Sequence, residues 1–99
     1  MNEIQFLIYD EGGQTEVLVQ DETLWATQKS IAELFSVSVP TINEHLKNIF
    51  ESGELEQNPT IRKFRIVRQE GSRQVTREIE HYNLDAIISV GYRVNSQKA

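Results

Sequence analysis

Hydrophobic residues alternate with other residues near the N-terminus, within 4–8 and again within 15–20. The stretch between them, 10–13, contains an acidic pair followed by two glycines and is a turn signal. Strict alternation predicts strands, because successive side chains of a strand point to opposite faces. Residues 1–22 are therefore predicted to form a β-hairpin that extends a sheet or covers the core.

A helical period replaces the alternation over residues 27–53. Thr27 can cap a first helix, Ser38 can cap a second, and Pro40 suits the first turn of that second helix. The second helix has one apolar stripe at helical spacing, formed by Ile42, Leu46, Ile49 and Phe50. Gly53 is placed to end it. The pattern predicts two short helices joined by a tight turn.

A second hairpin and a last helix are predicted in the C-terminal part. Residues 54–60 are polar and form a connection, and alternation around a glycine-containing turn predicts a hairpin over 61–82. The last helix is predicted over 83–92, capped by Asn83 and ended by Gly91. Its predicted common apolar face consists of Leu84, Ile87 and Ile88.

Two helices, a short turn and a basic hairpin, in that order, are typical of a winged helix-turn-helix. Ala32 supplies the small residue that lets the helices approach, and Ser36 stands where many such motifs have glycine. The apolar contacts between the helices are assigned to Ile31, Phe35, Val37, Ile42 and Leu46. We therefore expect one α+β domain over 1–99, a winged helix-turn-helix with an additional N-terminal hairpin and a C-terminal helix.

The charge is distributed unevenly along the chain. The net charge is −5, which argues against nucleic-acid binding because duplex affinity draws on neutralised phosphates. However, residues 1–26 carry −6, residues 27–60 carry −3 and residues 61–99 carry +4. The bases gather between Arg62 and Arg77, so the predicted wing supplies local positive charge within an acidic chain.

If the apolar stripe of the second helix faces inward, its polar residues face outward and become candidate DNA contacts. Asn43 could read adenine through two hydrogen bonds, and Lys47 could contact guanine or phosphate. Ser38 and Thr41 suit phosphate contacts near the helix start. Glu44 could accept from cytosine or pair with Lys47. The remaining candidate on this helix is Asn48, and a solvated face explains the same residues without DNA.

The predicted wing offers a second set of candidates. Arg68, Ser72 and Arg73 lie near its tip and are the expected contacts to the DNA backbone or the minor groove. Further bases follow along the strands: Lys63, Arg65 and Arg77. The alternative is that these charges only keep a sheet edge soluble.

Other chemistry has no visible basis in the sequence. With no cysteine and with only His45 and His81 as histidines, we expect no metal and no cofactor. No nucleophile-and-base arrangement stands out, so we expect no enzyme activity. No apolar run is long enough to span a bilayer and no signal peptide is visible, so a cytoplasmic protein without membrane contact is expected. Trp25 is expected in the core, whereas His45 could be partly buried or contact a phosphate.

Three stretches resemble the virulence RhuM family. They lie in 24–40, in His45-Leu46-Lys47-Asn48-Ile49-Phe50 and in Tyr82-Asn83-Leu84-Asp85-Ala86-Ile87-Ile88-Ser89-Val90-Gly91-Tyr92-Arg93-Val94-Asn95-Ser96. The resemblance implies bacterial pathogenicity islands and mobile elements as context, and an N-terminal fragment of a longer protein. A looser similarity exists to the N-terminal domains of Bro-type antirepressors.

The sequence thus predicts sequence-specific binding to double-stranded DNA and, with it, transcriptional regulation linked to virulence or mobile elements. The alternative is a protein-interaction module that uses the same helix and the acidic N-terminal hairpin to hold a partner protein. A homodimer is one option, because such motifs commonly act on paired half-sites.

Overall fold

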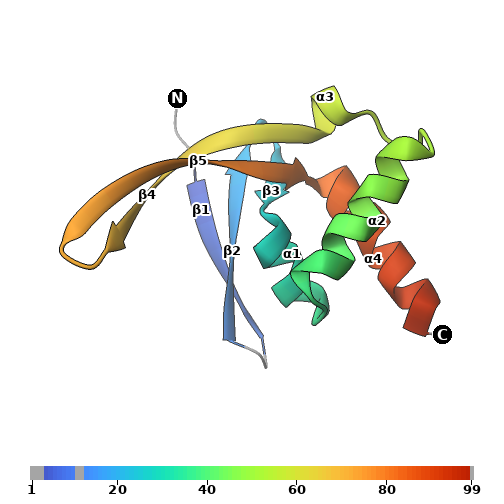
Figure 1. The fold of residues 1–99 in the computed structure, drawn as a ribbon, viewed down its shortest axis with the longest axis horizontal. Coiled ribbons are helices and arrows are strands. Elements are labelled where there is room, and N and C mark those ends of the chain that lie inside the picture. Colours follow the sequence, from blue (N-terminus) through green and yellow to red (C-terminus); the bar gives the residue numbers. More distant parts are fainter. Residues whose placement is uncertain (1–3, 11–12, 99) are drawn as a thin grey trace.

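The structure is a computed structural model that describes the backbone of residues 4–10 and 13–98 and the side chains of residues 15–96. The described residues form an α+β fold with four helices and one curled antiparallel sheet (Figure 1). The elements are β1 (Ile4–Asp10), β2 (Gly13–Gln20), β3 (Thr23–Ala26), α1 (Gln28–Phe35), α2 (Val39–Glu51), α3 (Gln57–Thr60), β4 (Ile61–Glu70), β5 (Arg73–Asn83) and α4 (Leu84–Lys98). The α+β class predicted from the sequence is confirmed. The predicted alternation within 4–8 concerns side chains outside the described residues.

The strands of the sheet follow the order β1-β2-β3-β5-β4. The strand β3 was not predicted, because the turn before it lacks a glycine or asparagine signal. Its two turn residues, Asp21 and Glu22, both have positive φ, at 55° and 61°. That conformation suits a two-residue hairpin loop even though these residue types adopt it reluctantly. Through Trp25 and Ala26, β3 pairs with β5 and joins the two hairpins into one sheet.

The two predicted helices and their caps are confirmed. Thr27 Oγ1 accepts a hydrogen bond from the Ser30 N–H at 3.0 Å, and Ser38 Oγ accepts one from the Thr41 N–H at 3.3 Å. Each cap satisfies an amide that lacks a partner inside its helix. Ser36 closes α1 in the left-handed conformation, with φ 57° and ψ 46°. The turn therefore has the geometry that glycine adopts most easily.

The end of α2 also follows the sequence signal. Gly53 has φ +80° and donates its N–H to Phe50 O, while Glu54 donates to Ile49 O. This pair of hydrogen bonds is the Schellman arrangement, which needs a left-handed residue just past the helix. The chain then continues into the short helix α3, which falls in the stretch predicted to be only a connection.

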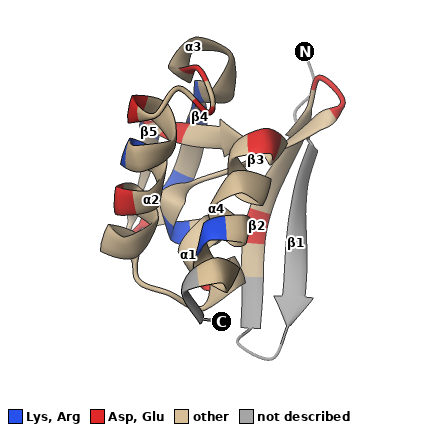
Figure 2. Cartoon of the chain, turned by 90° about the vertical axis from the view of Figure 1, so that its right-hand side faces the viewer, with Lys and Arg blue, Asp and Glu red and all other residues tan. Residues whose placement is uncertain are grey.

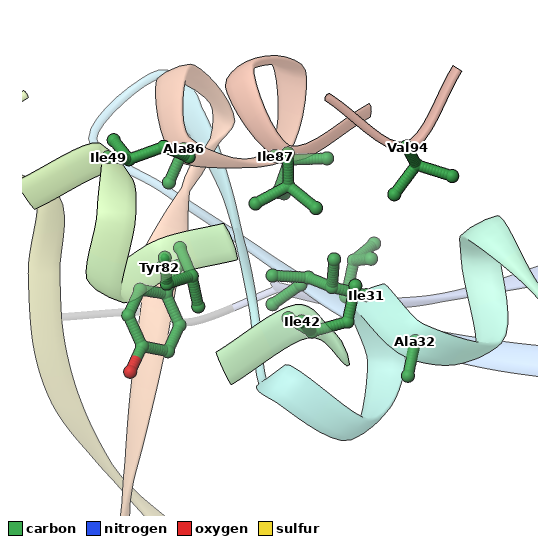
Figure 3. Close-up of a cluster of buried hydrophobic side chains, with 12 residues drawn as sticks. Ile31, Ala32, Ile42, Ile49, Tyr82, Ala86, Ile87 and Val94 are labelled. Carbon is green, nitrogen blue, oxygen red and sulfur yellow. The ribbon is translucent and has the colours of Figure 1, made fainter. Parts of the chain in front are cut away.

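The main core lies between the sheet and the three longer helices, as Figure 3 shows. Ile31 of α1 and Ile42 and Ile49 of α2 are completely buried, and Ala32 is 4% exposed. Ala86, Ile87 and Val94 reach this core from α4. A smaller cluster formed by Leu18, Trp25 and Phe64 lies between β2, β3 and β4, which confirms Trp25 as a core residue.

Two predictions about the last helix are wrong. The helix does not end at Gly91 but continues to Lys98. A Cβ at Gly91 would lie 2.7 Å from Phe35 Cζ, so this glycine allows α4 to pack closely on α1 instead of terminating the helix. The predicted face is also wrong, because Ile87 is buried whereas Leu84 and Ile88 are exposed.

The described helices include none that is long and apolar enough to cross a membrane.

Candidate nucleic-acid interface

The exposed side of α2 carries most of the candidates from the sequence. Glu44, Lys47 and Asn48 are exposed, and Figure 2 shows acidic and basic positions along this helix. The predicted pairing of Glu44 with Lys47 does not occur among the ion pairs of the described residues. Lys47 is therefore without an ion-pair partner there, while Glu44 adds an uncompensated negative charge to the same surface.

Ser38 and Thr41 contact each other at the start of α2. Their hydroxyl oxygens lie 2.9 Å apart, and Ser38 Oγ also caps the helix. The predicted phosphate contacts are thus brought together beside the amides of a helix N-terminus, where a phosphate oxygen is stabilised.

A hydrogen-bond network between α1, α2 and β5 holds Asn43. Gln28 Nε2 donates to Asn43 Oδ1 at 3.3 Å and to the Tyr82 hydroxyl at 3.1 Å. Burial raises the pKa of Tyr82 further above its ordinary value, which already lies well above neutral pH. The contact to Gln28 fixes the carboxamide of Asn43 and leaves its Nδ2 hydrogens available to a ligand. Sequence reasoning missed Gln28 and Tyr82, because these two partners are 54 residues apart.

The predicted wing is the β4–β5 hairpin, whose two strands are long. Its ladder runs from Ile61↔Tyr82 to Glu70↔Arg73, and Gly71 takes φ +65° in the two-residue loop. The hairpin extends well beyond the helices (Figure 1). All three candidates near its tip are exposed: Arg68, Ser72 and Arg73. In Figure 1 this tip lies at the opposite end of the molecule from α4.

Carboxylates neutralise part of the wing's positive charge. Arg62 pairs with Asp21 at 2.6 Å and lies over the Trp25 ring, 4.6 Å from its centroid. Arg68 pairs more loosely, at 3.6 Å, with Glu16 of β2. Both acids belong to the N-terminal segment, so the acidic segment and the basic wing are in direct contact. The separate charge totals of the two segments did not indicate this contact.

A third arginine of the wing is paired within the hairpin itself. Arg77 donates through Nε and Nη2 to the two carboxylate oxygens of Glu70, each at 3.0 Å. This fork lowers the pKa of Glu70 and raises that of Arg77. Among the described residues, the wing bases without an acidic partner within 4.0 Å are Lys63, Arg65 and Arg73.

The elements that carry the candidates, α2 and the β4–β5 hairpin, lie on one side of the molecule, although Arg68 pairs with Glu16 of β2. In Figure 1 the β4–β5 hairpin crosses in front of β1 and β2, and in Figure 2 α2, β4 and β5 lie on the side away from β1. Two of the unpaired wing bases, Arg65 and Lys63, stand opposite Glu78 and Glu80 in the ladder.

Of the two alternatives that the sequence left open for His45, the structure supports burial. It is 5% exposed, and its Nε2 has no hydrogen-bond partner among the described residues. It lines a groove between α2 and α4 together with Asn48 of the candidate interface. The described residues contain no group of three side chains that could hold a metal ion.

Comparisons with known proteins bear on the C-terminal part of the chain. Residues 59–99 match the Virulence protein RhuM family. No curated protein and no solved structure matches the chain. The match spans β4, β5 and α4, whereas the stretches within 24–50 lie outside it, and their resemblance stays a prediction. The resemblance of this chain to the Virulence protein RhuM family is confirmed over residues 59–99.

Proposed function

We propose that the chain is a winged helix-turn-helix module that binds double-stranded DNA. In this proposal α2 enters the major groove and the β4–β5 hairpin contacts the flanking backbone. The observation that carries it is the sequence of capped helix, three-residue turn and capped helix, followed by a long hairpin on the same side of the molecule.

The packing of the two helices supports the proposal. Ala32 is buried, and it belongs to the main core cluster together with the predicted apolar residues of both helices. The side chains left outside include Asn43, which is oriented by Gln28, and Lys47, which has no ion-pair partner among the described residues. Both are residue types that read base edges or contact phosphates. Base reading through α2 would make the binding sequence-specific.

The charge sets the expected strength of binding. Three arginines of the wing are already paired with carboxylates: Arg62 with Asp21, Arg68 with Glu16 and Arg77 with Glu70. Few unpaired bases remain to release counterions, so we expect modest affinity and a shallow salt dependence. The confirmed family resemblance adds a context of virulence functions, and transcriptional regulation in that context is part of this proposal.

Alanine substitutions test the assignment of residues. Fluorescence anisotropy with a labelled duplex pool should show weaker binding for Lys47→Ala and Arg73→Ala, with a salt slope lower by about one for each phosphate that the variant no longer neutralises. Arg62→Ala is the matched control, because it removes the same charge from an arginine that is paired with Asp21 and is not among the proposed contacts. Equal effects of all three substitutions would contradict the assignment.

The acidic surface also favours a second candidate, a protein-interaction module. The net charge of −5 and the glutamates along α2 would suit a basic partner protein. In that case Lys47→Ala would leave partner binding unchanged, whereas Glu44→Gln would weaken it.

A further inference from the structure

A cavity lies between α1 and the curled sheet. It has a volume of about 190 Å³ and is lined by side chains of β2, α1, β4 and β5. Part of its wall is apolar, because Leu18 and Ile66 of the smaller core cluster line it. A protein cavity of about 150 Å³ holds a benzene molecule, so this one has room for roughly seven to nine non-hydrogen atoms. Apolar walls combined with a few polar groups are typical of a site for a small molecule.

Two acidic and two basic side chains line the same cavity. Arg68 and Glu16 form an ion pair at 3.6 Å, which links β4 to β2. Lys29 and Glu33 are both exposed on α1, and neither has an ion-pair partner among the described residues. The cavity wall therefore carries one positive and one negative charge that the described part of the chain does not pair.

These two unpaired charges are placed against the dipole of α1. Lys29 lies in the first turn, at the positive end of the helix dipole, and Glu33 lies in the last turn, at its negative end. With the lysine first, they also have the less favourable order for an ion pair along a helix. The stability of α1 therefore does not account for them. A ligand with its anionic group at Lys29 and its cationic group at Glu33 places each of its charges at the helix end that favours it.

Ser30 adds a hydrogen-bond donor next to Lys29. It is 6% exposed and lines the cavity. Its Oγ accepts a hydrogen bond from the Thr27 hydroxyl at 3.2 Å, which leaves its own hydroxyl hydrogen without an acceptor among the described residues. A carboxylate accepts such a hydrogen bond and pairs with a lysine ammonium at the same time. The anionic end of a ligand therefore belongs at the start of α1.

We propose that this cavity binds a small α-amino acid with an apolar side chain. Its carboxylate pairs with Lys29 and accepts a hydrogen bond from Ser30, while its ammonium group pairs with Glu33. Its side chain packs on Leu18 and Ile66. A zwitterion matches the walls, because they carry as many positive as negative charges. The inference concerns the cavity beside α1 and does not depend on DNA binding.

An NMR titration of the isotope-labelled chain with glycine and with L-alanine, L-valine, L-leucine and L-isoleucine tests the proposal without DNA. We expect L-valine or L-leucine to shift amides of α1 and β4, with a dissociation constant on the order of 1 mM. Isovalerate is L-valine without its amino group, and isobutylamine is L-valine without its carboxylate. Each should bind roughly fivefold more weakly, the upper range for the loss of an exposed ion pair. Absence of shifts in α1 and β4 with all five amino acids, or equal affinity of L-valine and either analogue, would overturn the proposal.

Substitutions on α1 test which end of the ligand each residue holds. Lys29→Met should weaken the binding of L-valine and isovalerate but not of isobutylamine, and Glu33→Gln should weaken that of L-valine and isobutylamine but not of isovalerate. Lys63→Met and Glu51→Gln are the matched controls, because Lys63 lies on the face of β4 opposite to Ile66 and Glu51 lies on α2.

Loss of folding does not imitate the expected result. Lys29→Met and Glu33→Gln each remove an unfavourable charge from α1, so both variants should melt at the temperature of the unchanged chain or above it. Equal weakening by the control substitutions, or the reverse pattern with the two analogues, would overturn the proposal. Because no DNA is present, this failure is distinguishable from a failure of the proposed DNA binding.

Discussion

Replacing Gly91 by alanine should destabilise the protein, although alanine favours a helix more than glycine does. Gly91 lies inside α4, where the exchange alone would stabilise the helix by about 1 kcal/mol. The new Cβ would lie 2.7 Å from Cζ and 3.0 Å from Cε1 of the Phe35 ring. Carbon atoms in contact normally lie about 3.5–4.0 Å apart, so the two helices must separate or the ring must move.

The overlap should outweigh the helix propensity. Added atoms in a well-packed contact cost about 1–3 kcal/mol, and two ring carbons meet the new methyl group head-on. Set against the gain of about 1 kcal/mol, this gives a net loss of up to about 2 kcal/mol in the free energy of unfolding, or up to roughly 15 °C in melting temperature for a domain of this size. Urea unfolding followed by circular dichroism measures it.

A second substitution separates the contact from other effects of alanine. In the Phe35→Leu background the ring edge is gone, so Gly91→Ala should be neutral or stabilising there. If Gly91→Ala instead stabilises the wild-type chain by about 1 kcal/mol, helix propensity alone governs this position, and the close approach of α4 to α1 is refuted.

Three further substitutions test individual features. Ser36→Gly should stabilise the chain by about 0.5–1 kcal/mol in urea unfolding, since position 36 has φ 57°; a loss of stability would contradict that conformation. Hydrogen bonds to Ser89 and Arg93 lower the pKa of Glu54, so its contribution to stability is present above its ordinary pKa and is lost as the pH falls through the lowered value. Glu54→Gln should therefore cost stability at neutral pH and little in strong acid. An equal cost at both pH values would show that the charged carboxylate is not the source of the stabilisation. Glu16→Gln should strengthen DNA binding more than Glu22→Gln does, because only the former releases Arg68; equal changes would indicate a general charge effect.

The local signals in the sequence predicted local structure well. Thr27, Ser38 and Gly53 begin or end helices through hydrogen bonds within a few residues, and those contacts are encoded by neighbours in the chain. The apolar spacing of α2 was sufficient to identify its buried face, because one stripe of a helix faces one core. Class and order of the main elements follow from such short-range rules.

Contacts between distant segments account for what the sequence did not predict. The role of Gly91 depends on Phe35 of α1, and the same residue type serves equally well as a helix terminator. The exposed side of α4 could not be recognised either, since Leu84 and Ile88 have the hydrophobicity of core residues. The strand β3 owes its place to pairing with β5, a strand much later in the chain.

In the candidate site, too, local features were predictable from the sequence and contacts between distant segments were not. The exposed positions on α2 follow from its helical period, and Lys47 and Asn48 lie outside as expected. The ion pairs of Arg62 and Arg68 do not follow from the sequence pattern, because they depend on carboxylates from another hairpin. Arg68 was predicted from its place near a turn, and its contact with Glu16 arises only when β2 and β4 are brought together.

Titration of a labelled duplex DNA pool with this chain at several salt concentrations tests the central claim most directly. The proposal predicts binding at low salt that weakens steadily as salt is raised and that the combined Lys47→Ala, Arg68→Ala and Arg73→Ala variant loses. Absence of binding at the lowest salt concentration, with a folded protein, would contradict DNA binding and favour a protein partner for the same surface.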